Sequence, residues 1–421
     1  MSAGIGGSLV SGLRCVRCGR AWRSGLDGHC PRCGPEGVLD VSYDLGRVRR
    51  AMTRRALAAR PLTAWRYREL LPLAPTARVP PWAPGWTPVV ESQPLARWAG
   101  ARRVLVKDEG RNPTASFKDR ASSVGVARAM ARRARVVACA STGNAATSLA
   151  GAAASVGLPC VIFVPEFAPE PKVAQLLVFG ARVLRVRGSY DATWEMCQRA
   201  CERYGWYNRN AAVNPSLVEG KKTGGLEIAE QCGGEMPDWV AVSVGDGCTI
   251  AGIWKGLVEM KALGFLTRPP RLLGVQAAGA RPLVDAFAAG RDLVPGPAET
   301  IADSICVGHP RNWRKALRAV RASGGAFVAV EDEAILDAQR ETGRRAGLFG
   351  EPAAAAALAG LKQAVADGIV GRRASALAVL TGSGLKDVRA ALRAGGSPVD
   401  LAPDDEALDE HLRERPLGTG K

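Results

Sequence analysis

The feature that most constrains the fold of this chain is a repeated alternation of short apolar runs with longer helical stretches. The runs are rich in β-branched residues, and Ala-rich segments of about 10 to 18 residues separate many of them. Uniformly apolar runs indicate strands that are buried on both faces, as in a parallel sheet covered by helices. The pattern therefore predicts an α/β protein with a largely parallel sheet. The predicted strands are 104–107, 135–140, 161–165, 182–186, 240–244, 272–276 and 377–381.

The length of 421 residues allows two or three domains at about 150 residues each. No uninterrupted apolar stretch reaches the roughly 18 residues of a membrane span, so we expect no membrane association. The N-terminal segment lacks the basic and then apolar pattern of a secretory signal, and we therefore expect a cytoplasmic protein. A Pro-rich passage at 72–88 cannot be crossed by a helix and is predicted to be an irregular connector.

The chain is strongly basic, with 57 Lys and Arg against 40 Asp and Glu and a formal net charge of +17. Such a charge can indicate a nucleic-acid partner. Here the arginines are scattered, with only short clusters at 47–55 and 132–135, so we do not expect nucleic-acid binding. An anionic substrate or cofactor would suit the charge equally well.

Four of the eleven cysteines form two close pairs, Cys15 with Cys18 and Cys30 with Cys33. Two C-x-x-C pairs, each followed by Gly, have the spacing of a zinc ribbon. In a reducing compartment, four such thiolates indicate a metal ion rather than disulfides. We expect a closed, structural Zn²⁺ site, because four thiolates leave no coordination position open for catalysis. The alternative is a ribbon that folds without metal.

Two polar segments follow predicted strands, at the edge where open α/β sheets place their ligands. Lys118 follows a turn and opens a helix. A lysine with a suppressed pKa is the residue of Schiff-base chemistry, although a solvated surface lysine would leave the same pattern. The second segment could present free N–H groups to an anion such as a carboxylate, or could simply cap a helix. It consists of Ser141, Thr142, Gly143 and Asn144.

Two glycine-containing segments follow later strands. The first could wrap a phosphate at the positive end of a helix dipole, but a lone G-x-G is a weak signal. It consists of Gly245, Asp246, Gly247, Cys248 and Thr249. The second begins at Thr381 after the final apolar run and could be only a tight turn. Taken singly, none of these segments decides the function.

Taken in order, the segments resemble the threonine synthase family, within the β-family (fold type II) of pyridoxal-phosphate enzymes. The lysine motif reads VKDEGRNPTASFKDR and the asparagine segment reads ASTGN. The resemblance runs through nearly the whole chain and begins with the ribbon. Further collinear matches are WRY, GWTP, EGKKT, PDWVAVSVG, GVQAAGARP, FGEPAAA and LTGSGLKD.

The resemblance implies a two-domain fold similar to that of tryptophan synthase β, with parallel sheets and an N-terminal zinc-ribbon-like segment. The expected ranges are 1–45 for the ribbon, 46–124 with 211–401 for a large cofactor-binding domain, 125–210 for a small mobile α/β domain, and 402–421 for a peripheral tail. The family also implies a homodimer and an amino-acid substrate, over which the small domain closes.

The resemblance further implies a role for each segment. Lys118 would form the Schiff base with pyridoxal 5'-phosphate and shuttle protons, and Asn144 would hydrogen-bond the cofactor's ring oxygen. The backbone of 141–144 would bind the substrate carboxylate, and 245–249 would hold the cofactor phosphate. Thr381 would face the pyridine nitrogen, where a neutral hydroxyl favours elimination and replacement chemistry.

Several positions depart from the family's pattern. For the phosphate of O-phosphohomoserine the family uses two hydroxyls and an arginine, and this chain has Ala145, Ala212 and Leu217 there. Hydrogen bonds to charged groups contribute roughly 1.5–3 kcal/mol each, so losing three removes about 5–8 kcal/mol of phosphate recognition. The cofactor loop also carries Asp246 near the expected phosphate. Ala115, where the lysine motif often has Gly, is expected to be a mild change that adds one methyl group.

These departures lead to an expectation about the substrate. The chain is expected to act on an amino acid by α-deprotonation and β- or γ-elimination or replacement through Lys118, and not on O-phosphohomoserine. The alternative is threonine synthase proper, with a phosphate site rebuilt from Arg209, Ser216, Lys221 or Lys222. An alternative of another class is a non-catalytic relative that binds the cofactor or a partner for regulation.

Overall fold

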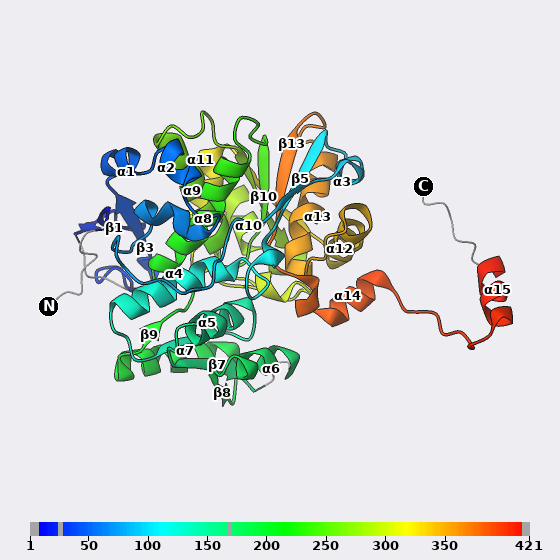
Figure 1. The fold of residues 1–421 in the computed structure, drawn as a ribbon, viewed down its shortest axis with the longest axis horizontal. Helices are drawn as coiled ribbons and strands as arrows, with labels where there is room; N and C mark the ends of the chain where they lie inside the picture. The colour runs from blue at the N-terminus through cyan, green and yellow to red at the C-terminus, as the bar shows by residue number, and fades with distance from the viewer. Residues whose placement is uncertain (1–7, 24–27, 167, 169, 415–421) are drawn as a thin grey trace.

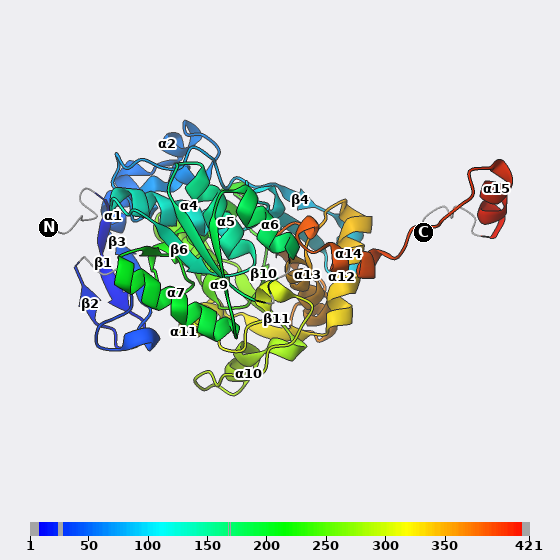
Figure 2. The same cartoon turned by 90° about the horizontal axis from the view of Figure 1, so that it is seen from below.

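The structure is a computed structural model that describes residues 8–23, 28–166, 168 and 170–414. It contains three β-sheets, which Figure 1 shows as separate layers. The N-terminal sheet lies at the left, the central sheet above and a second parallel sheet below. Figure 2 shows the same arrangement from below, with the last helix away from the body at the end of an extended stretch.

The central sheet has six strands in the order β12-β11-β10-β13-β5-β4. All neighbours are parallel except β4 and β5, which pair antiparallel at one edge. In β10, Val240 and Val242 enter one hydrophobic core and Ala241 enters the other, so both faces are buried as the uniformly apolar runs predicted. The strands are β4 (Val89–Glu91), β5 (Arg103–Asp108), β10 (Trp239–Ser243), β11 (Arg271–Ala277), β12 (Ala326–Val330) and β13 (Ser375–Leu380).

The second sheet has four parallel strands in the order β8-β7-β6-β9. Its strands are β6 (Val137–Ala140), β7 (Cys160–Pro165), β8 (Arg182–Val186) and β9 (Tyr207–Asn208). All four fall inside the range 125–210 that the sequence assigns to a small domain. The domain boundaries themselves stay a prediction.

The N-terminal sheet is antiparallel, with β1 (Val10–Cys15) between β2 (Ala21–Trp22) and β3 (Leu39–Tyr43). It has no core of its own among the described residues. Leu13, Val41 and Tyr43 instead enter the core that covers one face of the central sheet. The small sheet is therefore packed onto the body of the protein.

Helices cover both faces of the central sheet. Residues of α3, α12 and α13 form the core on one face, and residues of α8, α9 and α11 form the core on the other. In the described ranges, no helix combines the length and apolar character needed to cross a bilayer. The α-helices are α1 (Leu45–Ala51), α2 (Arg54–Ala58), α3 (Gln93–Ala99), α4 (Lys118–Ala131), α5 (Asn144–Ala154), α6 (Glu170–Val178), α7 (Tyr190–Tyr204), α8 (Ser216–Gln231), α9 (Cys248–Ala262), α10 (Pro282–Ala288), α11 (Trp313–Ser323), α12 (Asp332–Ala346), α13 (Pro352–Ala366), α14 (Val388–Gly395) and α15 (Asp405–Glu414). The 3-10 helices are η1 (Gly34–Glu36), η2 (Ala64–Leu70), η3 (Glu109–Arg111), η4 (Ala278–Ala280), η5 (Asp303–Ile305) and η6 (Gly384–Lys386).

The seven predicted strands are all present, with ends that shift by one or two residues. The sequence prediction did not include β1, β2 and β3 of the ribbon. It also missed β4 and β9, which are too short to show a periodicity, and β12, whose apolar run stands directly after a Gly-Gly pair. The passage 72–88 contains no helix or strand, as its prolines predicted.

A buried cluster of four charges joins β5, α4 and α8. Arg120 Nε donates to Glu109 Oε2 at 2.7 Å, and Arg120 Nη1 donates to Glu227 Oε1 at 2.6 Å. Lys107 Nζ lies 3.1 Å from Glu227 Oε2, and all four side chains are fully buried. Burial alone would raise the pKa of Glu227, but Arg120 and Lys107 hold it at about 2. Because its charges balance, the cluster can remain ionised away from water.

We expect Arg120→Leu to lower the free energy of unfolding by about 3–5 kcal/mol, because it leaves two buried carboxylates with one ammonium. Urea unfolding measures this loss. Arg111→Leu is the matched control, since the Arg111 side chain is 70% exposed and its ion pair with Asp108 should contribute less than about 1 kcal/mol. Equal losses in the two variants would show that the buried cluster does not stabilise the fold.

Candidate active site

The turn before Lys118 is held by the loop that follows β13. Phe117 N donates to Thr381 O at 2.8 Å, and Ser383 N donates to Ala115 O at 3.0 Å. Lys118 is the first residue of α4, so these bonds place its side chain beside the loop that carries Thr381. The two segments are far apart in sequence, but they meet because β5 and β13 are parallel neighbours.

Ala115 adopts a left-handed backbone conformation with φ of +60°. In this region a Cβ atom costs about 1–2 kcal/mol, which is why glycine is favoured there. The expectation that Ala115 adds only a methyl group is therefore incomplete. The strain lies in the backbone of the lysine turn, and the two hydrogen bonds to the Thr381 loop hold the turn in place.

Asn144 opens α5 at the carboxyl end of the second sheet and reaches the central sheet through its side chain. Its Nδ2 donates to Glu351 Oε1 at 2.7 Å and to Ser304 Oγ at 3.3 Å. Glu351 N in turn donates to Gly382 O at 3.0 Å, in the same loop as Thr381. Glu351 lies in the family match FGEPAAA, but no role was predicted for it, because its contact with Asn144 leaves no local pattern in the sequence.

The segment predicted to bind a carboxylate lies between β6 and α5. Gly143 is the N-cap of α5, and Gly143 N donates to Ser141 Oγ at 3.2 Å. The side chains of Ser141 and Thr142 are partly exposed, whereas Asn144 is buried. The first N–H groups of α5 are therefore directed toward the space beside Asn144, where an anion can accept from them.

The segment 245–249 forms the turn between β10 and α9, and α9 begins at Cys248. Gly247 has a φ of +85°, and a Cβ there would lie 2.8 Å from the Cβ of Ala316, so the turn requires glycine. The Asp246 carboxylate accepts from the backbone N–H of Arg311 at 3.2 Å, which gives this charge a donor of its own. The open first turn of a 15-residue helix after a glycine turn suits a phosphate, so the residues present fit the cofactor.

The environment of Lys118 makes its ammonium easier to deprotonate than that of a lysine in water. The pKa of Lys118 is lowered from 10.5 to about 8, first by burial and then by the positive charge of Lys221. Arg209 adds to the effect, and Glu351 opposes it. Two cationic side chains from separate parts of the chain therefore lie close to Lys118.

Of the residues proposed from sequence to rebuild a phosphate site, Lys221 and Arg209 lie close enough to Lys118 to lower its pKa. Both are at least 97% buried. In the part of the chain that the structure describes, no carboxylate lies within 4.0 Å of the Lys221 ammonium. The Lys222 ammonium is instead bound by Glu219 at 2.7 Å and by Glu259 at 2.8 Å.

The three positions that depart from the family's pattern carry apolar side chains. Ala212 is buried and packs in a hydrophobic cluster with Cys248. Leu217 is buried, and its side chain contacts α4 at Gly125. Ala145 stands in the first turn of α5 and is partly exposed. These side chains offer no donor to a phosphate, in agreement with the sequence analysis.

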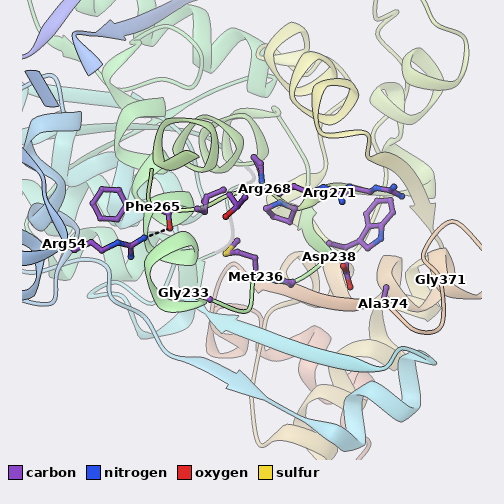
Figure 3. A pocket seen from close by; sticks show the side chains of 16 residues that line it. Arg54, Gly233, Met236, Asp238, Phe265, Arg268, Arg271, Gly371 and Ala374 are labelled. Carbon is purple, nitrogen blue, oxygen red and sulfur yellow. Dashed lines mark hydrogen bonds between the residues drawn. The ribbon is translucent and has the colours of Figure 1, made fainter. Parts of the chain in front are cut away.

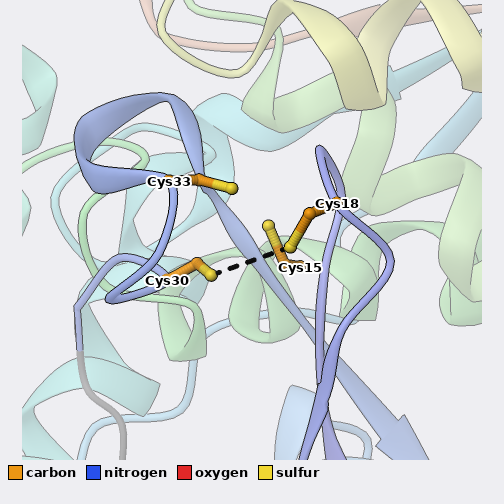
Figure 4. Close-up of side chains that lie close together, drawn as sticks. All are labelled: Cys15, Cys18, Cys30 and Cys33. Carbon is orange, nitrogen blue, oxygen red and sulfur yellow. Dashed lines mark hydrogen bonds between the residues drawn. The ribbon is translucent and has the colours of Figure 1, made fainter.

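The four cysteines of the ribbon come together, as Figure 4 shows. Their Sγ atoms all lie within 4.8 Å of one another, and those of Cys18 and Cys30 are 3.9 Å apart. Tetrahedral zinc with Zn–S bonds of about 2.3 Å separates its sulfurs by about 3.8 Å, so the four thiols fit a closed Zn²⁺ site. The glycines after the two pairs, Gly19 and Gly34, both have positive φ.

A separate pocket of about 830 Å³ lies at the amino-terminal ends of β10, β11 and β13 (Figure 3). It is lined by residues such as Asp238, Trp239 and Arg271. The loops that carry Lys118 and Thr381 follow the carboxyl ends of the neighbouring strands. The pocket therefore lies at the opposite edge of the sheet, and none of the predicted site residues lines it.

The fold and the lysine site define a class of enzyme, and comparison with known proteins agrees. A family model described as pyridoxal-phosphate dependent enzyme matches residues 83–382. Among solved structures, the threonine deaminase of T.th. is 27% identical with a TM-score of 0.60, covering 70% of this chain and 92% of that one. The processed threonine deaminase isoform 2 of Solanum lycopersicum has a TM-score of 0.64 at 20% identity, covers 73% of this chain and 86% of that one, and shows the common fold.

Comparison with curated relatives identifies the family within this class of enzymes. The threonine synthase of Methanocaldococcus jannaschii is 38% identical over 404 residues, which cover 95% of this chain and 99% of that protein. The threonine synthase of Mycobacterium tuberculosis is 38% identical over 352 residues, covering 82% and 94%. The chain belongs to the threonine synthase family of pyridoxal-phosphate-dependent enzymes. These relatives give no support to the expectation that O-phosphohomoserine is excluded as substrate.

We expect cofactor-free protein to take up pyridoxal phosphate about five times faster at pH 8 than at pH 7, with a plateau above about pH 9. The reason is that a lysine pKa of about 8 makes the neutral amine, which attacks the aldehyde, predominant above that pH. Stopped-flow absorbance gives the rate, and borohydride trapping with mass spectrometry identifies the labelled lysine. Lys118→Arg is the control that should remain unlabelled. A rate that still climbs tenfold between pH 9 and 10 would contradict the lowered pKa.

Proposed function

We propose that this protein is a threonine synthase that converts O-phosphohomoserine and water to threonine and phosphate. The observation that carries the proposal is the buried positive charge of Lys221 and Arg209 beside Lys118. A buried ammonium without a carboxylate is unfavourable unless an anion binds to it. A phosphorylated substrate supplies such an anion, and the threonine synthase relatives support the same choice.

In this proposal each segment of the candidate active site has one role. Pyridoxal phosphate, when bound, supplies an electron sink for charge that develops at the substrate carbons. Lys118 holds the cofactor and moves protons to and from the substrate's carbon atoms, for which its lowered pKa suits it. The N–H groups at 141–144 bind the substrate carboxylate, and Asn144 orients the cofactor ring. The turn 245–249 would hold the cofactor phosphate, and Thr381 would offer its hydroxyl to the ring nitrogen.

The substrate phosphate is bound differently from the family's pattern. Burial lowers the pKa of Lys221, while the Cys248 thiol and Asp246 oppose this shift and Arg209 adds to it. A phosphate dianion would favour the protonated form of Lys221 and so gain a charge-assisted hydrogen bond. Lys221 and Arg209 would then replace the donors lost at 145, 212 and 217.

We also propose that the four ribbon cysteines hold one Zn²⁺ ion as a structural site. The geometry of the thiols supports this proposal, and their number leaves no place for a metal-bound substrate. The homodimer that the family resemblance implies and the cytoplasmic location that the N-terminal segment suggests stay predictions.

The purified, cofactor-loaded protein is expected to release phosphate and form threonine from O-phosphohomoserine at about 1 s⁻¹ or faster, as working enzymes do. Coupled phosphate detection and amino-acid analysis follow the two products, with Lys118→Ala as the blank. If the cofactor is bound but neither product forms, the substrate is another amino acid, and donors with non-phosphate leaving groups become the candidates.

Lys221→Gln is expected to raise the KM for O-phosphohomoserine about 10- to 100-fold, because one hydrogen bond to a charged group is lost. Steady-state kinetics measure KM, and a titration of pyridoxal phosphate measures cofactor affinity in the same variant. Lys261→Gln, an exposed lysine at the end of α9, is the control and should leave both values unchanged. A loss of cofactor affinity with an unchanged KM would show that Lys221 serves the cofactor phosphate instead.

A further inference from the structure

The ribbon packs directly against residues beside the proposed phosphate sites. Val16 and Val38 of the ribbon share one hydrophobic cluster with Ala212 and Cys248. Val218, in the first turn of α8, and Ala211 complete this cluster. Cys248 opens α9 at the turn proposed to hold the cofactor phosphate, and Ala212 stands where the family places a substrate-phosphate donor. The apolar residues at these two positions therefore form a surface that the ribbon covers.

The position of Val38 depends on both cysteine pairs. Val16, which stands between Cys15 and Cys18, donates its backbone N–H to Val38 O at 3.0 Å. Cys30 N donates to the carbonyl of Gly37, directly before Val38, at 2.8 Å. A metal ion that holds the four thiolates together would therefore also fix the segment that presents Val38.

A polar contact lies beside this apolar one. The Asp40 carboxylate accepts from Lys255 Nζ at 3.1 Å and from Lys315 Nζ at 2.9 Å. Lys255 Nζ also donates to Glu219 Oε1 at 2.7 Å, and Tyr43 donates its hydroxyl to Glu219 Oε2 at 2.9 Å. Strand β3 thus binds α8 through Glu219, α9 through Lys255 and α11 through Lys315.

The residues that bind the ribbon stand in the same helices as the residues on which the proposed function rests. Glu219 stands two residues before Lys221 in α8, and Lys255 stands two turns after Cys248 in α9. A displaced ribbon would leave Lys255 and Lys315 without Asp40 and would expose the apolar cluster to water. The first turns of α8 and α9 would then lose the packing that fixes them.

We propose that the metal-loaded ribbon is a positioning element of the active site, which holds the turn 245–249 and the first turn of α8 in their phosphate-binding geometry. The inference rests on the proposed roles of that turn and of the cysteines. A small segment without its own core cannot stay folded by burial alone, so its structure depends on the metal ion and on the body of the protein. Metal binding and cofactor binding are therefore coupled, and the coupling is reciprocal.

The first test compares the affinity of the full-length chain for pyridoxal phosphate with and without Zn²⁺. Metal content is measured by elemental analysis, and cofactor binding is followed by visible absorbance. Zinc-depleted protein is expected to bind the cofactor at least about tenfold more weakly, and re-added Zn²⁺ is expected to restore the affinity. Equal affinities, or a purified protein that contains no metal and still binds the cofactor, would overturn the proposal.

The second test leaves the metal site intact and weakens the contact between Asp40 and the two lysines. Asp40→Asn is expected to weaken cofactor binding about 5- to 10-fold while one Zn²⁺ per chain is retained, because the link to Lys255 and Lys315 loses its charge. Glu36→Gln is the matched control on the same ribbon: its carboxylate lies 3.4 Å from Arg314 of α11 and has no ion pair with α8 or α9 among the described residues, so the change should leave affinity within twofold. Identical affinities in the two variants would contradict the inference.

A milder variant covers the case in which Asp40→Asn fails to fold. Val38→Ala removes two methyl groups from the apolar contact and leaves all four cysteines and the ion pairs in place. It is expected to raise the dissociation constant of the cofactor about threefold or more, at unchanged zinc content. Because cofactor binding is measured without substrate, these results are independent of whether O-phosphohomoserine is the substrate. An unchanged dissociation constant in Val38→Ala would count against the ribbon as a positioning element.

Discussion

The position of Lys118 depends on the buried ion cluster around Arg120, two residues further along α4. Arg120 binds Glu109 at the end of β5 and Glu227 in α8, so three elements are joined by charges that are fully buried. Buried charges tolerate little movement, because a lost partner leaves an ion without water or counterion. The lysine turn and α8, which carries Lys221, therefore belong to one rigid unit.

The remaining groups are brought to this unit by loops from both parallel sheets. Asn144 comes from the second sheet and meets Glu351 and Ser304 of the larger one. The glycine turn at 245–249 and the Thr381 loop follow strands of the central sheet. Because parallel strands bring their carboxyl ends to one edge, segments from across the sequence can surround a single lysine. The cationic groups beside it then favour an anionic ligand.

The segments of the candidate site could be located from the sequence, because each one is a local signal at the end of an apolar run. Lys118, Asn144 and Thr381 could be found in this way, although their roles stay predictions. The role of Glu351 could not be predicted, because it depends on a hydrogen bond with Asn144, which follows a strand of the other parallel sheet. The contact of the ribbon with Cys248 could not be predicted from the sequence either, because packing between distant segments leaves no spacing pattern in the chain.

The pairing of β5 with β13 also has a consequence for how the chain reaches its native state. β5 is made early in synthesis, but its parallel neighbour is the last strand of the central sheet. The backbone bonds that hold the lysine turn come from the loop after that strand. A nascent chain therefore cannot complete the lysine turn until residues beyond Thr381 have left the ribosome, and contacts of such long range form slowly. The lysine turn is among the last parts of the molecule to become ordered.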